Sequence, residues 1–338
     1  MSRMNEGATN GVPSQLIRAD RPQQVPWAAV AVFVVVACGL AWLVALPLWL
    51  RGGAEGQGFA TLLSLLAPVM MLTPTVATLV VVFLMRTPRG ERLRFLGMWP
   101  LRPAKRVIWF AVAAVFAPVF LVALSLGVAA LLGWVTLDLV NFSGFAETLA
   151  ASVPEAAQSM LPPIGTLVVI QLASIPLGAL INSFLAFGEE LGWRGWLIPA
   201  LRPLGTWPAL IISGVIWGLW HSPLILLGYN FGLTDWRGVA LMTAGCVAWG
   251  VLLGWSRLRS GSVWPAVFGH GALNAAAGMF GLFAAAGSEI DPALVLPLGV
   301  SGWIAIAAFV VVLVLGGQFS DSRQPELAPQ KIAVQARP

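Results

Sequence analysis

Residues 27–50 read WAAVAVFVVVACGLAWLVALPLWL and carry no charged side chain. A helix needs about 20 consecutive apolar residues to cross the roughly 30 Å hydrocarbon core of a bilayer, so this stretch is long enough to span a membrane. Further apolar runs follow at approximately 59–85, 107–134, 165–201, 207–229, 238–255, 263–284 and 298–316. We therefore predict an all-α polytopic membrane protein with about eight transmembrane helices.

The composition of the whole chain supports this prediction. Of 338 residues, 58% are hydrophobic and 10% are charged, and the mean hydropathy is +0.86. Soluble domains carry about 25% charged residues, so a soluble globular protein is excluded. The two cysteines, Cys38 and Cys246, lie inside apolar runs and are interpreted as small buried hydrophobic residues, not as a disulfide framework.

The basic residues predict the orientation. If both termini are cytoplasmic, only Arg51 and Arg237 of the 19 Lys and Arg residues face outward. Cytoplasmic loops carry the excess of Lys and Arg in membrane proteins. We therefore predict cytoplasmic termini and a location in the plasma membrane. The same rule explains the net charge of +5 without a nucleic-acid partner.

The most informative residues are the ionisable ones inside the apolar runs. A charged side chain near mid-bilayer costs about 2.5–3.5 kcal/mol on insertion scales, so it is rarely accidental. Three polar groups occur, in the sequences FGEELGWR (187–194), WGLWHSP (217–223) and FGHGALN (268–274). Each contains two residues four apart, on one helix face: Glu190 with Arg194, Trp217 with His221, and His270 with Asn274.

Each group taken alone has an ordinary structural explanation. Glu189 and Glu190 could mark a helix end, and histidine or asparagine in a span is often a structural hydrogen-bonding residue. The apolar residues 196–201 that follow the glutamates argue against a helix end there. The chain has two histidines, and both lie inside spans in such a pair. Together the groups favour a functional site.

These residue types suit a hydrolase that activates water. One glutamate would take a proton from water while His221 helps to hold that water. His270 and the amide of Asn274 could donate hydrogen bonds to the oxyanion formed at a peptide carbonyl. No Gly-x-Ser-x-Gly sequence is present, so a serine nucleophile fits poorly.

The three groups together resemble the CPBP intramembrane endopeptidases, the family of CAAX prenyl protease 2, also called the Abi family. The resemblance rests on Glu189-Glu190-x-x-x-Arg194, Trp217-x-x-x-His221 and His270-x-x-x-Asn274. It implies a helical membrane core with an active site open toward the cytoplasm and a protein or peptide substrate. It also implies that Glu189 is the base, that His221 holds the water, that His270 and Asn274 bind the oxyanion, and that Glu190 and Arg194 support charge and helix position. Trp217 departs from the phenylalanine that often stands in the second motif.

We accordingly divide the chain into three regions. Residues 1–26 are a predicted disordered cytoplasmic tail, 27–316 a transmembrane domain with its catalytic core at about 165–284, and 317–338 a cytoplasmic C-terminal tail. The expected partners are membrane lipids and a protein or peptide substrate, which could itself be associated with the membrane.

Three alternatives remain open at this stage. Glu189, His221 and His270 could form a zinc site, a ligand set that catalytic zinc uses, although metal-free glutamate catalysis is favoured because no His-Glu-x-x-His sequence occurs. The chain could be a non-catalytic membrane immunity or scaffold protein. A proton-coupled transporter, a less favoured reading, would also use intramembrane Glu and His residues.

Overall fold

The computed structural model describes residues 24–325, so most of the two predicted tails lies outside the described residues. Over this range the chain is helical, with one isolated β-bridge between Leu137 and Ala284. Seven helical segments are long and apolar enough to cross a membrane: Trp27–Leu50, Phe59–Leu84, Ala104–Leu131, Ile164–Leu204, Trp236–Ser260, Trp264–Phe283 and Pro292–Leu315. The prediction of an all-α polytopic membrane protein is confirmed.

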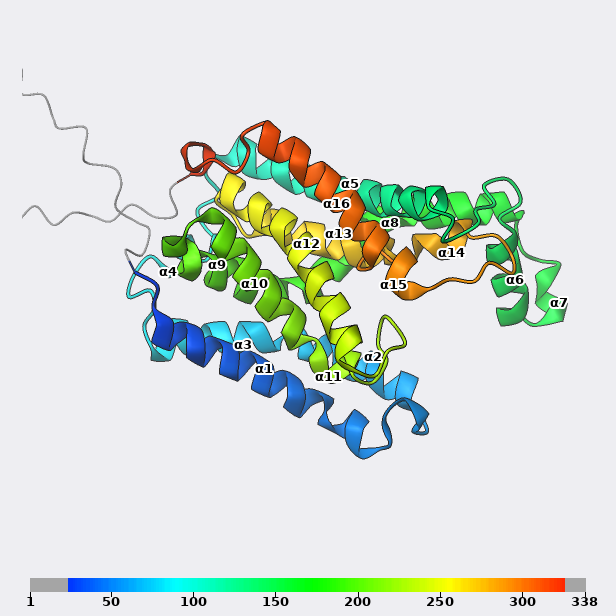
Figure 1. Ribbon diagram of the computed structural model, residues 1–338, viewed down its shortest axis with the longest axis horizontal. Coiled ribbons are helices and arrows are strands. Elements are labelled where there is room, and N and C mark those ends of the chain that lie inside the picture. Colours follow the sequence, from blue (N-terminus) through cyan, green and yellow to red (C-terminus); the bar gives the residue numbers. More distant parts are fainter. Residues whose placement is uncertain (1–23, 326–338) are drawn as a thin grey trace, which may run out of the picture.

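The helices form a bundle with the start of α1 and the end of α16 at one end and α6 and α7 at the other (Figure 1). Its longer elements are α1 (Trp27–Leu50), α2 (Phe59–Met70), α3 (Thr73–Leu79), α5 (Ala104–Leu131), α6 (Ser143–Ser152), α8 (Ile164–Glu190), α10 (Thr206–Trp220), α12 (Trp236–Ser260), α13 (Trp264–Ala276) and α16 (Val300–Leu315). Single turns connect them: α4 (Arg92–Phe95), α7 (Glu155–Gln158), α9 (Ile198–Leu201), α11 (Ser222–Ile225), α14 (Phe280–Phe283) and α15 (Pro292–Val295).

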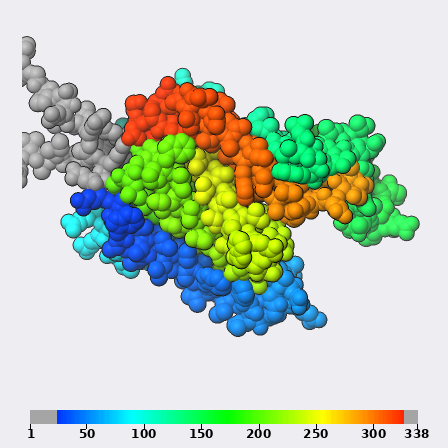
Figure 2. Space-filling view, viewed as in Figure 1, coloured from blue at the N-terminus to red at the C-terminus, as the bar shows by residue number. Residues whose placement is uncertain are grey.

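We call the end that holds the start of α1 and the end of α16 the terminal end, and the opposite one the distal end (Figure 1). The terminal-end loops are 85–103, 202–205, 261–263 and 316–325, and the distal-end loops are 51–58, 132–163, 226–235 and 284–299. Figure 2 shows the α1–α2 region (blue) and the α6–α7 region (green) diverging toward the distal end.

One of the predicted spans is interrupted in the structure, and another continues through a π-helix. The predicted span 207–229 is shorter, because α10 ends at Trp220 and a separate turn, α11, begins at Ser222 with Pro223 in its first turn. Proline has no N–H and favours a helix start, so the helix breaks here. The long run 165–201 is one continuous segment, in which the i→i+5 bonds of a π-helix extend α8 over Leu191–Leu197. Such π segments are frequent at functional sites.

Close helix contacts hold the polar residues in place. Helix α13 packs between α5 and α8, and α10 packs on α12. A Cβ on Gly271 would lie 2.4 Å from the carbonyl oxygen of Ala179, and one on Gly218 would lie 2.3 Å from the Cα of Thr243. Only glycine permits these approaches, which bring α13 against α8 and α10 against α12.

Candidate active site

Glu189 is buried in the last turn of α8 and is held by two indole N–H groups. Its Oε2 accepts a 2.6 Å hydrogen bond from Trp217 Nε1 and a 3.3 Å bond from Trp193 Nε1. Trp193 lies one turn further along the same helical segment, whereas Trp217 comes from α10. The carboxylate orientation is therefore set by two elements.

Glu190 joins α8 to α13. Its Oε1 accepts a 2.7 Å hydrogen bond from Arg194 Nη1 and a 2.9 Å bond from His270 Nδ1. The side chains of Glu190 and Arg194 are buried, at 0% and 1% exposure. Ion pairs taken out of water need several such contacts to offset desolvation, and here the i, i+4 pair is completed by an imidazole. Because Nδ1 of His270 donates to Glu190, its Nε2 is the ring atom left for a ligand.

His221 directly follows α10 and is held by the backbone of that helix. Its Nδ1 lies 2.8 Å from the carbonyl oxygen of Trp217, so Nδ1–H is the donor and Nε2 of the neutral ring is an acceptor. The Trp220 ring packs edge-on against the imidazole at 4.7 Å, and Cys246 Sγ lies 3.8 Å from Nδ1.

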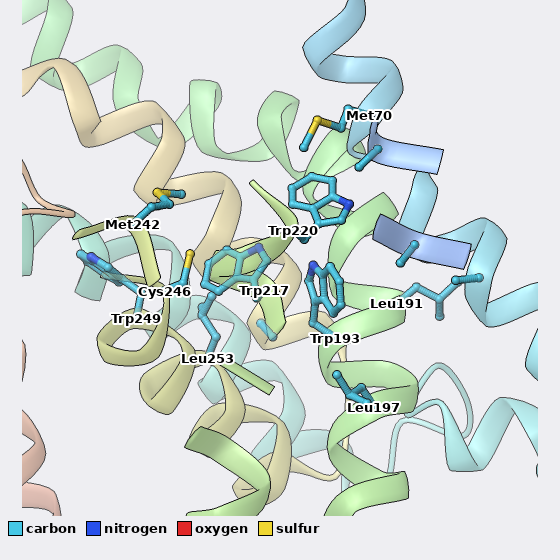
Figure 3. Packing of buried hydrophobic residues seen from close by; sticks show 14 of the residues in the cluster. Met70, Leu191, Trp193, Leu197, Trp217, Trp220, Met242, Cys246, Trp249 and Leu253 are labelled. Atoms are coloured by element: carbon cyan, nitrogen blue, oxygen red, sulfur yellow. The ribbon is translucent and has the colours of Figure 1, made fainter. Parts of the chain in front are cut away.

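Trp217 connects all three sequence groups. Besides bonding Glu189, its ring lies 5.3 Å from the His270 ring and 5.8 Å from the His221 ring. The guanidinium of Arg194 sits over the same indole at 4.2 Å, within cation–π distance. In Figure 3 the indoles of Trp193, Trp217 and Trp220 lie close together around this position.

A cavity of about 470 Å³ adjoins these residues. Its lining includes four of the six predicted site residues: Glu189, His221, His270 and Asn274. Asn274 is an exposed residue on α13, one turn beyond His270. The other two, Glu190 and Arg194, are buried and do not line it. The structure thus brings the acid, two imidazoles and the amide to one hollow, with the ion pair behind it.

Several cavity residues escaped the sequence reasoning. Asn182 on α8 and the loop residues Tyr229 and Asn230 line the cavity beside the predicted set. Asn182 could have been found, because it is a polar residue inside an apolar run. Tyr229 is the only tyrosine of the chain, but its distance from the motifs gave no reason to select it. Trp193, which bonds Glu189, occupies one of the three x positions of the motif Glu189-Glu190-x-x-x-Arg194, so the motif gave no reason to select it.

A preformed metal site is not apparent in the part of the chain that the structure describes. Within residues 24–325, no three His, Cys, Asp or Glu side chains are grouped closely enough to hold a metal ion. The alternative zinc set, Glu189, His221 and His270, therefore borders the cavity without being gathered as ligands. The two glutamates instead bond indole, guanidinium and imidazole N–H groups.

Comparison with known proteins gives the same assignment as the three sequence groups. Residues 171–276 match the model of the type II CAAX prenyl endopeptidase Rce1-like family. Over these residues the chain is similar to the CAAX protease family. CAAX prenyl protease 2 of Methanococcus maripaludis is 28% identical over 116 residues, an alignment that covers 26% of this chain and 42% of the relative. The chain thus matches less than half the length of that CAAX protease. The family segment includes every residue from Glu189 to Asn274, as the motif resemblance predicted.

Proposed function

We propose that this chain is an intramembrane endopeptidase that hydrolyses a peptide bond in a membrane-associated protein or peptide. One observation carries the proposal: Glu189, His221, His270 and Asn274, from three separate helical segments, line one cavity. The similarity of residues 171–276 to a peptidase family supports the same reaction class.

In the proposed reaction, Glu189 acts as general base. It takes a proton from a water molecule whose other contact is Nε2 of His221, and the water oxygen attacks the scissile carbonyl carbon. The tetrahedral intermediate then collapses, the C–N bond breaks, and Glu189 returns the proton to the leaving nitrogen. The bonds from Trp217 and Trp193 to Oε2 hold the carboxylate for both transfers.

His270 and Asn274 would stabilise the oxyanion. Since Nδ1 of His270 donates to Glu190, its Nε2 can donate to substrate only if the ring is an imidazolium. The negative charge of Glu190 favours this form, which gives the second glutamate an electrostatic role. The Asn274 amide supplies a neutral donor from the same helix, and such preorganised donors are a large part of acyl-transfer catalysis.

The test compares membranes that contain the wild-type protein with membranes that contain Glu189→Gln. The substitution keeps the shape and an acceptor for Trp217 but removes the base. We expect quantitative profiling of peptide N-termini to show cleavage products that vanish in this variant but persist in Glu147→Gln, an exposed control on α6. Identical profiles in wild type and Glu189→Gln would contradict the proposal and favour a non-catalytic scaffold, or a transporter if ion flux is lost.

A further inference from the structure

The cavity reaches only one end of the bundle. Its loop residues are Tyr229, Asn230, Phe231, Leu296, Pro297 and Leu298, all from distal-end loops. Helix α2 contributes lining residues from Ser64, in its middle, to Met70 at its end, and Met71 follows directly. Within residues 24–325, no cavity-lining residue comes from a terminal-end loop. The diverging helices of the distal end lie on this same side (Figure 2).

The terminal end is closed by hydrogen bonds behind the site. Arg257 is fully buried on α12, where its Nε donates to the carbonyl oxygen of Arg194 and its Nη2 to that of Phe95. The carbonyl oxygen of Gly97 accepts from the backbone N–H of Val263 at 3.0 Å and from Ser262 Oγ at 3.0 Å. The loop 85–103 is therefore fastened across this end of the bundle.

Charge separates the two ends in the same way. Within the described residues, the basic side chains of the terminal end and its loops are Arg86, Arg89, Arg92, Arg94, Arg102, Lys105, Arg106, Arg202, Arg257, Arg259 and Arg323. The distal end has Arg51 and Arg237, and Arg237 is paired with Asp235 at 2.8 Å. The acids of the distal end are Glu55, Asp138, Glu147, Glu155, Asp235, Glu289 and Asp291. Lys and Arg concentrate on the cytoplasmic side, which assigns the terminal end to the cytoplasm.

We propose that the catalytic cavity opens to the extracytoplasmic side, and that its substrate is a peptide segment of an exported or membrane-anchored protein presented from that side. The part of this inference that concerns a substrate rests on the proposed function, whereas the direction in which the cavity opens does not. The proposed direction differs from the cytoplasmic active site that the family resemblance implies, and it keeps the predicted cytoplasmic termini. A cytoplasmic terminal end and a cytoplasmic active site do not fit together, because the start of α1 and the end of α16 lie at the terminal end, whereas the loop residues that line the cavity come from the distal end.

The chemistry of the cavity fits such a segment. Besides the polar residues of the site, the cavity is lined by apolar side chains of α2, of Met71 just after it, and of the distal loops, including Ala67, Pro68, Leu296 and Leu298. An extended peptide with apolar side chains would contact this apolar lining while its scissile carbonyl faces Asn274 and His270. The C-terminal tail of a cytoplasmic substrate would have to pass the loop 85–103, which Arg257 holds across the terminal end, to reach the same position.

Cysteine accessibility tests the direction of opening. The parent protein carries Cys38→Ala and Cys246→Ala, and Ser64→Cys and Tyr229→Cys each place one thiol at the cavity. Gly90→Cys is the control for accessibility of the terminal end. Ala156→Cys, on α7, is the control for accessibility of the distal end. Right-side-out and inside-out membrane vesicles are treated with a charged, membrane-impermeant methanethiosulfonate.

We expect Ser64→Cys, Tyr229→Cys and Ala156→Cys to react in right-side-out vesicles, and Gly90→Cys to react only in inside-out vesicles. Reaction of the cavity thiols from the same side as Gly90→Cys, or reversal of the whole pattern, would overturn the proposal. Ser64→Cys changes one atom, so it remains informative if Tyr229→Cys fails to fold. The result does not depend on peptidase activity, because the same labelling can be measured in the Glu189→Gln protein.

Discussion

Trp217 donates a 2.6 Å hydrogen bond from its indole nitrogen to Oε2 of Glu189. A phenylalanine at this position, as the second motif of the family often has, could not make this bond. In this chain the carboxylate is therefore oriented by a group from α10, and the same indole touches both histidine rings.

Trp217→Phe should lower kcat with little effect on KM. The substitution keeps an aromatic ring beside His221 and His270 but removes the donor to Glu189. Hydrogen bonds to charged groups contribute about 1.5–3 kcal/mol, which corresponds to a loss of roughly 10- to 150-fold in rate. Steady-state cleavage assays in proteoliposomes measure kcat and KM for the variant and the wild type. Trp220→Phe is the matched control, because Trp220 donates to Thr73 and not to Glu189, and an equal loss of kcat in both variants would contradict the positioning role.

Glu190→Gln should lower both activity and stability, for separable reasons. The variant leaves the buried Arg194 without a counter-charge, and breaking a buried pair in this way costs about 3–5 kcal/mol. It also removes the charge that favours the imidazolium form of His270. Thermal unfolding in detergent and cleavage assays give the two readouts. The double variant Glu190→Gln/Arg194→Met should regain part of the stability but none of the activity; recovery of activity would refute the electrostatic role of Glu190.

The sequence predicted the elements better than it predicted their arrangement. The first span was predicted at 27–50 and α1 occupies Trp27–Leu50, because a long uncharged run ends at Arg51. The run 207–229 failed as a single span because hydropathy does not register the break at Pro223. Two of the three i, i+4 pairs are in contact, since Arg194 donates to Glu190 and Nδ1 of His221 bonds the carbonyl oxygen of Trp217.

The features of the site that the sequence did not predict depend on contacts between segments far apart in the chain. Nothing in the spacing of Glu189 and Trp217 shows that the indole nitrogen would meet the carboxylate across two helices. The side on which the cavity opens could not be predicted either. It depends on which loops surround His221 and Asn274 in space, and the structure places Tyr229 and Leu298 of two distal-end loops in the lining of the same cavity.

Exhaustive chelation should leave peptidase activity unchanged. Two indole N–H groups hold Oε2 of Glu189, as suits a positioned general base, and within residues 24–325 no three His, Cys, Asp or Glu side chains are grouped for a metal ion. The experiment treats purified protein with a strong chelator, removes the chelator and assays cleavage. Loss of activity that zinc restores would instead support the alternative of Glu189, His221 and His270 as ligands.

The distal segment around Asp138 should loosen in acid. Backbone N–H groups of Asn141, Val140 and Ser143 bond this carboxylate, led by Asn141, and lower its pKa from 3.8 to about 2. A lowered pKa in the folded state means that the stabilisation is complete above pH 3.8 and is lost as the pH falls through about 2. Hydrogen exchange of residues 138–152 should rise over this range in wild type. In Asp138→Ala it should be fast already at neutral pH, and equal protection in both proteins would contradict the assignment.

Gly97→Ala should destabilise the closed terminal end. Gly97 has a φ of +71°, and an added Cβ would lie 2.7 Å from Cζ of Arg257 and 2.8 Å from the backbone nitrogen of Val263. A non-glycine residue held in such a conformation costs about 1–3 kcal/mol, before the clash with Arg257 is counted. The melting temperature in detergent should fall accordingly. Gly90→Ala, in the same loop but with open space around its Cα, is the control and should melt like wild type. Equal melting temperatures for the two variants would show that the loop 85–103 is not fastened through Gly97.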